Sequence, residues 1–168
     1  LKYAPLDKDY SVTLSAFEAT QQNVVNRVSG IIYQTDEVQV RGIELEGVAA
    51  LSKRLNVTAA LSVQDPEVTK SVTPAQIGKL PYTVPKTQQS LFASYKVPLS
   101  QNMGGELTVG GGARRIGKTA GDTANTFFVP SYTLVDAFLR YDLGKYSFQL
   151  NGYNPVSYTH LTLPTTPY

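Results

Sequence analysis

Apolar and polar residues alternate along most of this chain, and this pattern constrains its fold more than any other feature. In the stretch LNVTAALSV (residues 55–63), Leu55 and Val57 alternate with Asn56 and Thr58. Successive side chains of a β-strand point to opposite faces, so a period of two predicts strands with one apolar and one polar face. The composition agrees, because the chain has 11 Tyr and only 17% charged residues. The same alternation marks residues 40–51, 106–114, 131–143 and 145–153.

The connections between these stretches alternate in kind. Short polar turns alternate along the chain with long, irregular links, which indicates an antiparallel meander with all its long loops at one end. Strands of about ten residues, with tight turns at one rim and long loops at the other, are typical of an outer-membrane β-barrel. We therefore expect an all-β chain of about eight strands and no amphipathic helix. Turns are expected at 5–9, 52–55, 98–105 and 142–145, and long links at 26–34, 65–85 and 118–130.

Such a barrel directs its apolar face to lipid and its polar face to a wet lumen. On the lumen side we expect Glu44, Glu46, Asp136 and Arg140. On the lipid side of the curved sheet we expect a larger set, because its members share one parity along strands that tight turns join. This set is Leu55, Val57, Leu61, Leu107, Val109, Val135, Leu139, Phe148 and Leu150.

Two other classes of protein remain open at this point. A different outer-membrane barrel, such as a porin or an autotransporter translocator, would show the same alternation. A soluble β-sandwich binding module would also alternate, although its strands are usually about five or six residues long and its two rims are alike. A sandwich should purify without detergent, whereas a barrel should not.

The composition argues against several functions. The net charge of +2 and the scattered Lys and Arg residues give no reason to expect a nucleic-acid partner. There is no Cys, and His160 is the only His, so no thiolate or polyhistidine metal site can form. We find no nucleophile paired with a base and no paired carboxylates placed for catalysis. The sequence therefore predicts no enzyme, no catalytic, cofactor-binding or metal-binding residues, and no cofactor.

One nucleotide-binding pattern is present. Residues 112–119, GARRIGKT, fit the P-loop pattern G-x-x-x-x-G-K-[ST]. A P-loop needs a helix after it, because the helix N-terminus helps to hold the phosphates. The residues after Thr119 instead read as a loop, and Asp136, the only candidate for a magnesium-binding Asp, lies in mid-strand. We interpret the match as coincidence and expect no nucleotide partner.

Several motifs resemble the TonB-dependent siderophore receptors, and in particular their ferrichrome-type members. YQTDEVQVRGIELEG (33–47) resembles the Gly-Val-Glu-Leu-Glu strand of that family, and LPYTVPKTQQSLFASYKV (80–97) resembles the stretch after it. The most specific match is GDTANTFFVPSYTLVDAFLRYDL (121–143), and FQLNGYN (148–154) resembles the start of the penultimate strand. The resemblance covers residues 1–154.

This resemblance implies a receptor in the bacterial outer membrane that imports an iron–siderophore complex. The family fold is a 22-stranded barrel filled by an N-terminal plug domain, and the TonB complex of the inner membrane supplies the energy. Residues 1–154 would be a C-terminal portion of that barrel, in contact with membrane lipid, without the plug. Neither the siderophore nor its contact residues can be assigned from this segment, and no bond-making chemistry is implied.

The last residues depart from the family pattern. After Asn154 the chain reads PVSYTHLTLPTTPY, and one reading frame of a common sequencing-library adapter encodes residues 155–165 in order. We interpret residues 155–168 as an artefactual tail, with a divergent C-terminus as the alternative. Pro155, Pro164 and Pro167 lack backbone donors, so we expect no continuation of the sheet here, and we expect no site at His160.

Aromatic and charged residues have both structural and functional interpretations. Tyr95, Tyr141 and Tyr146 lie near the predicted short turns, where barrels carry an aromatic girdle. Three other aromatic residues lie in or beside the long links, where they either pack the loops or contact a siderophore. These are Tyr82, Phe127 and Phe128. The four lumen charges either form an ordinary solvated wall or meet the plug.

Overall fold

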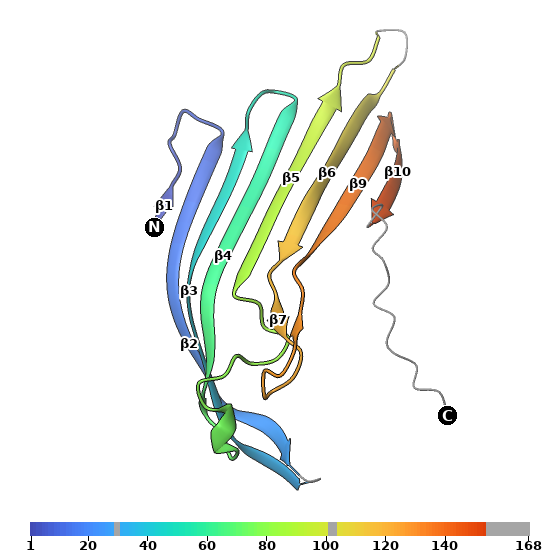
Figure 1. The fold of residues 1–168 in the computed structure, drawn as a ribbon. Coiled ribbons are helices and arrows are strands. Elements are labelled where there is room, and N and C mark those ends of the chain that lie inside the picture. The colour runs from blue at the N-terminus through green and yellow to red at the C-terminus, as the bar shows by residue number, and fades with distance from the viewer. Residues whose placement is uncertain (29–30, 101–103, 154–168) are drawn as a thin grey trace, which may run out of the picture.

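The computed structural model describes residues 1–28, 31–100 and 104–153, and within them it contains one large β-sheet (Figure 1). The sheet has eight strands in the order β1-β2-β3-β4-β5-β6-β9-β10, and every neighbouring pair is antiparallel. This confirms the predicted all-β meander. Its strands are β1 (Lys2–Tyr3), β2 (Tyr10–Val28), β3 (Ile31–Ala50), β4 (Leu55–Lys70), β5 (Thr87–Val97), β6 (Glu106–Ile116), β9 (Tyr132–Leu143) and β10 (Tyr146–Tyr153).

Smaller elements lie in the long connections. A 3₁₀ turn, η1 (Pro74–Gln76), lies between β4 and β5, and the two-residue strands β7 (Thr119–Ala120) and β8 (Phe128–Val129) pair between β6 and β9. In the described parts of the chain no helix is long and apolar enough to span a bilayer.

The pairing register places the predicted apolar residues on one face of the sheet. Directly paired residues share a face, and one row of partners runs across five strands. This row is Leu55, Tyr95, Val109, Leu139 and Leu150. Four of the nine residues predicted to share a face belong to this row. Each of the other five lies an even number of positions along its strand from a member of the row, so all nine share this face.

Neither face of the sheet is covered. Of the residues whose side chains are described, only Asp36, Pro66 and Ala120 are buried. Leu45 on β3 remains 42% exposed and Leu150 on β10 remains 72% exposed. A β-sandwich would bury such residues between two layers. The sheet is instead a single curved layer (Figure 1), which argues against the sandwich interpretation.

The short turns lie together at one end of the sheet, as predicted, with small shifts in their bounds. Leu55 and Asp142 belong to strands rather than turns, so the last hairpin turns through Gly144 and Lys145 alone, with Gly144 at a φ of +57°. A two-residue hairpin turn needs positive φ, and glycine adopts it without strain. The tyrosines near these turns are on the apolar face: Tyr3, Tyr10, Tyr95, Tyr141 and Tyr146.

The strands next to the long connections are longer than predicted. β2, β3 and β4 have 19, 20 and 16 residues, so residues 26–28 and 31–34, expected in an irregular link, belong to strands. The ladder continues because its polar side chains pair across the strands. Gln39 donates to Glu18 at 2.6 Å, and Lys70 lies 2.8 Å from Glu37. Apolar residues are adjacent in parts of these extensions, as at Val24 and Val25 or Ile31 and Ile32, so no period of two marked them in the sequence.

The predictions for the C-terminal tail, including His160, fall on residues 154–168, which lie outside the described residues.

Candidate functional site

The polar face of the sheet carries the four predicted lumen charges. Glu44 pairs with Ser62 and Glu46 with Ala60, on the face opposite Leu45 and Leu61. Asp136 and Arg140 on β9 share this face, because they alternate with Val135 and Leu139. The structure therefore places the four charges on one face, as predicted, but it divides them between two regions of the sheet.

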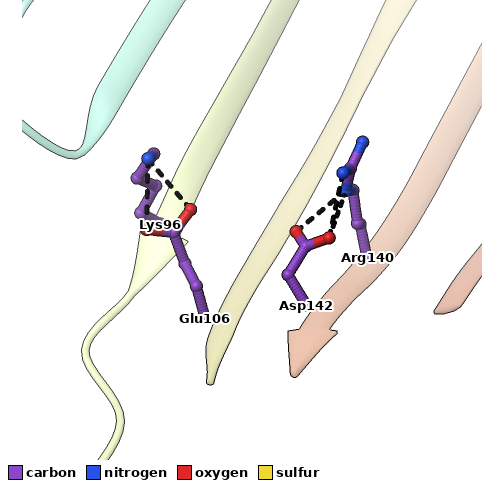
Figure 2. Close-up of polar contacts among 4 residues, drawn as sticks. All are labelled: Lys96, Glu106, Arg140 and Asp142. Carbon is purple, nitrogen blue, oxygen red and sulfur yellow. Dashed lines mark hydrogen bonds and ion pairs between the residues drawn. The ribbon is translucent and has the colours of Figure 1, made fainter. Parts of the chain in front are cut away.

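Charges on β5, β6 and β9 form ion pairs. Arg114 lies 3.1 Å from Asp136, Lys96 lies 2.9 Å from Glu106, and Arg140 lies 2.8 Å from Asp142. The last two pairs lie side by side near the short turns (Figure 2). Glu106 and Asp142 are direct cross-strand partners, so the two carboxylates would repel each other without these cations.

Glu44 and Glu46 differ from these residues. Within the described residues, neither carboxylate has a cationic partner within 4 Å. Both line an open hollow of about 280 Å³ on the polar face, together with Arg114. The hollow therefore offers two free acceptor groups to whatever occupies this face.

Three phenylalanines interrupt the polar face, and each lies over a glycine on the neighbouring strand. Phe92 and Phe138 stack in parallel with their ring centres 6.0 Å apart, above β6. Their direct partners on β6 are Gly112 and Gly110. Any side chain at Gly112 would clash, because a Cβ there would lie 2.5 Å from the carbonyl oxygen of Leu91. The third pair of this kind is Phe17 with Gly42.

The P-loop match takes part in this packing. Gly112 begins the pattern in mid-strand, the strand continues to Ile116, and Thr119 starts the short strand β7 rather than a helix. The ammonium of Lys118, which would hold phosphate in a P-loop, lies 5.0 Å from the ring centre of Phe128. The segment therefore lacks the helix N-terminus that a P-loop requires.

The long connections cluster at the opposite end from the short turns. Two of the three loop aromatics pack within this cluster, since Phe128 lies beneath Lys118 and Phe127 lies against Gly121. Tyr82 lines a cavity of about 340 Å³ at this end of the sheet, and Phe128 lines another of about 480 Å³. All three rings stay exposed, with Tyr82 at 56%, Phe127 at 55% and Phe128 at 42%, so exposure does not distinguish among them.

Sequence reasoning missed two residues that organise this cluster. Asp36 is buried and accepts hydrogen bonds from the backbone N–H of Val72 and the hydroxyl of Ser71, both at 3.0 Å. Asn125 connects two loops through its side-chain amide. Their partners lie 35 to 45 residues away in the sequence, so no local pattern could have revealed them.

Asp122 stabilises the turn that contains Asn125. Its carboxylate accepts hydrogen bonds from the hydroxyl of Thr126 and, at 2.7 Å, from the backbone N–H of Thr126. These bonds, led by that from the hydroxyl, hold the pKa of Asp122 below its usual value. Across the described residues, no group of three or more His, Cys, Asp or Glu is placed to hold a metal ion.

The whole described sheet matches one protein family. The sequence profile described as "TonB dependent receptor-like, beta-barrel" aligns with residues 1–154. The chain belongs to this family of TonB-dependent receptors. Its place is therefore the bacterial outer membrane, and the receptor interpretation is favoured over a porin, an autotransporter translocator or a soluble sandwich.

Individual TonB-dependent receptors agree with the profile. The ferrichrome outer membrane transporter/phage receptor of Escherichia coli K12 is 38% identical over 151 residues, which are 86% of this chain and 19% of that protein. The ferrioxamine receptor of Yersinia enterocolitica is 34% identical over 152 residues, or 89% of this chain and 20% of that one. The chain thus spans about a fifth of the length of these curated relatives.

Solved TonB-dependent receptors show the same fold. The ferric preacinetobactin receptor of Acinetobacter baumannii superposes with a TM-score of 0.75 at 28% identity, covering 91% of this chain and 24% of that one. The siderophore receptor PiuA of the same species gives 0.70 at 31% identity, covering 89% and 22%.

The phenylalanine–glycine packing in this receptor segment can be tested with two valine substitutions. Gly112→Val should lower the free energy of unfolding by about 1–3 kcal/mol, because the added methyl groups meet a backbone carbonyl and the ring of Phe92. Gly47→Val is the matched control, since a Cβ at Gly47 meets nothing within 4 Å. Valine also suits a strand, so the control should change stability by no more than about 0.5 kcal/mol.

Urea unfolding of the full-length receptor in lipid vesicles measures both variants. Equal unfolding midpoints for the two variants would show that the ring of Phe92 does not fill the space over Gly112.

Proposed function

We propose that this chain is part of the wall of an outer-membrane receptor that imports an iron–siderophore complex. The observation that carries the proposal is the uncovered single-layer sheet, apolar on one face and polar on the other, in a chain of this family. The names of the relatives give the ligand class, because the aligned proteins are receptors for ferrichrome and ferrioxamine.

In this proposal the wall closes as a 22-stranded barrel around an N-terminal plug domain. The apolar face contacts lipid, and the tyrosines at the short-turn rim lie at one membrane interface. The polar face contacts the plug. Glu44 and Glu46 are the residues best suited to that contact, because their carboxylates line an open hollow and form no ion pair with a described residue.

Import would be driven from the inner membrane through the TonB complex acting on the plug. The wall itself would make and break no covalent bonds, so the receptor would transport its ligand unchanged. The long connections lie at the end where the ligand would enter, and Tyr82 and Phe128, which each line a cavity there, are loop aromatics that could contact it.

The test is iron uptake by cells whose only siderophore receptor is the full-length protein carrying this segment. Radioactive iron supplied as ferrichrome or as ferrioxamine B should enter saturably, and uptake should stop when the TonB complex is deleted. Uptake that neither saturates nor depends on TonB would identify a porin instead. No uptake of either complex would refute the proposed ligand class.

A further inference from the structure

Two long connections at the loop end are joined to each other. The first, residues 71–86, links β4 to β5, and the second, residues 117–131, links β6 to β9. Tyr82 and Ala120 form a parallel β-bridge, and the N–H of Thr83 donates to the carbonyl of Ala120 at 3.0 Å. The loops are therefore in backbone contact although their sequences are about 40 residues apart.

Asn125 makes a second connection, and it does so with its side chain. Its Oδ1 accepts a hydrogen bond from the N–H of Leu80 at 2.9 Å, and its Nδ2 donates to the carbonyl of Leu80 at 2.9 Å. The amide thus binds both backbone groups of one residue, as a partner strand would. Nδ2 also donates to the carbonyl of Asp122 at 3.2 Å, within its own loop.

The backbone at Asn125 explains why this residue type occurs here. Its φ is +58°, in the left-handed region, which glycine and asparagine adopt more readily than other residues. Aspartate could adopt the same conformation and accept from Leu80, but an ionised carboxylate cannot donate to the Leu80 carbonyl. Asparagine therefore satisfies both the backbone and the two hydrogen bonds.

The joined loops form one wall of the loop-end cavity of about 340 Å³. Leu80, Pro81 and Tyr82 come from the first loop and Thr123 from the second, and Gln76 donates to the Thr123 hydroxyl at 3.2 Å. The opposite side is formed by strand residues that include Val38 and Val68. Leu80, which Asn125 holds, thus lies two residues before Tyr82 in that wall.

The first loop is also fixed to strands at two points before Leu80. Asp36 on β3 accepts from the backbone N–H of Val72, and the N–H of Gly78 donates to the carbonyl of Val68 on β4 at 2.9 Å. The middle of the loop is held to the second loop by the Asn125 side chain at Leu80 and by the backbone contacts of Tyr82 and Thr83 with Ala120.

We propose that Asn125 is a positioning residue that joins the two loops into one wall and so sets how tightly the iron complex is bound. The part of this inference that concerns the ligand rests on the proposed function. Without this side chain the loops keep the contacts of Tyr82 and Thr83 with Ala120, but Leu80 loses two hydrogen bonds, so Tyr82 is held less firmly in the wall before the ligand arrives. Such pre-organisation raises affinity without adding a contact.

Asn125→Gly is the decisive variant, because glycine keeps the positive φ and removes only the side chain. Trypsin cleavage after Lys79, next to Leu80, reports on the first loop in the purified full-length receptor without any ligand. We expect cleavage there to accelerate about fivefold to tenfold in Asn125→Gly, since two hydrogen bonds to Leu80 are lost. Asn125→Asp keeps one of these hydrogen bonds, so its cleavage rate should lie between those of Asn125→Gly and the parent receptor.

Thr123→Ala is the matched control, because it loses the single hydrogen bond from Gln76 to the second loop. Its cleavage rate after Lys79 should change by less than about twofold. Unchanged cleavage after Lys79 in Asn125→Gly would overturn the inference, because it would mean that the loops do not depend on this side chain.

Uptake of iron supplied as ferrichrome and as ferrioxamine B tests the part of the inference that concerns ligand binding. In Asn125→Gly the half-saturating concentration should rise about fivefold or more while the maximal rate stays the same, because only binding is weakened. Faster cleavage with an unchanged half-saturating concentration would overturn the positioning role. If the parent receptor takes up neither complex, the proposed function fails, and the cleavage rates still decide whether Asn125 joins the loops.

Discussion

Arginine at position 59 is expected to lower the free energy of unfolding of the receptor by about 2–4 kcal/mol in a bilayer. Ala59 lies on the apolar face of β4, in a row of direct partners with Leu91, Ala113 and Val135. If that face contacts lipid, as proposed, the guanidinium would have to leave water near the middle of the apolar band. The hydrocarbon offers it no hydrogen-bond partner.

Ala60→Arg is a closely matched control. Ala60 is the same residue type, next in the same strand, but it faces the polar side opposite Glu46. An arginine there should change the free energy of unfolding by no more than about 0.5 kcal/mol, because water and the carboxylate of Glu46 can bind the guanidinium. Reversible unfolding of the full-length receptor in lipid vesicles measures both. Similar losses for Ala59→Arg and Ala60→Arg would contradict the assignment of the apolar face to lipid.

A polypeptide limited to residues 1–154 is expected to bind no iron–siderophore complex and to aggregate in water. β1 and β10 are the two edges of the described sheet, so each presents N–H and C=O groups without a partner strand. In hydrocarbon each such group costs several kcal/mol, and in water the open edges and the apolar face favour association. Gel filtration and a siderophore-binding assay on the refolded polypeptide provide the measurement.

Two results would contradict this expectation. One is a soluble monomer that binds ferrichrome or ferrioxamine B, which would mean that the wall segment alone forms a site. The other is ATP hydrolysis that depends on Lys118, which would mean that the P-loop pattern is functional after all. The complete receptor, purified in detergent, is the positive control for siderophore binding.

The face assignments could be predicted from the sequence because the side-chain period of a strand is fixed. Within each of the stretches around Leu55, Val109 and Leu139, parity alone decided which residues would share a face. The extensions of β2, β3 and β4 could not be predicted, since adjacent apolar residues such as Val24 and Val25, or a stretch such as DPEVTK (65–70), break the period of two. The contacts of Asp36 and Asn125 depend on how distant loops meet, which the sequence pattern does not encode.

The phenylalanine–glycine pairs on the polar face have a consequence for how this barrel wall can evolve. Phe92 with Gly112, Phe138 with Gly110 and Phe17 with Gly42 are each direct cross-strand partners. A larger residue at each glycine is blocked by the ring and also by a second neighbour, which is the carbonyl oxygen of Leu91 at Gly112, that of Ala93 at Gly110 and the Cβ of Gln64 at Gly42. Loss of a ring therefore does not by itself open the glycine position, so these glycines should be retained among related receptors even where the phenylalanine varies.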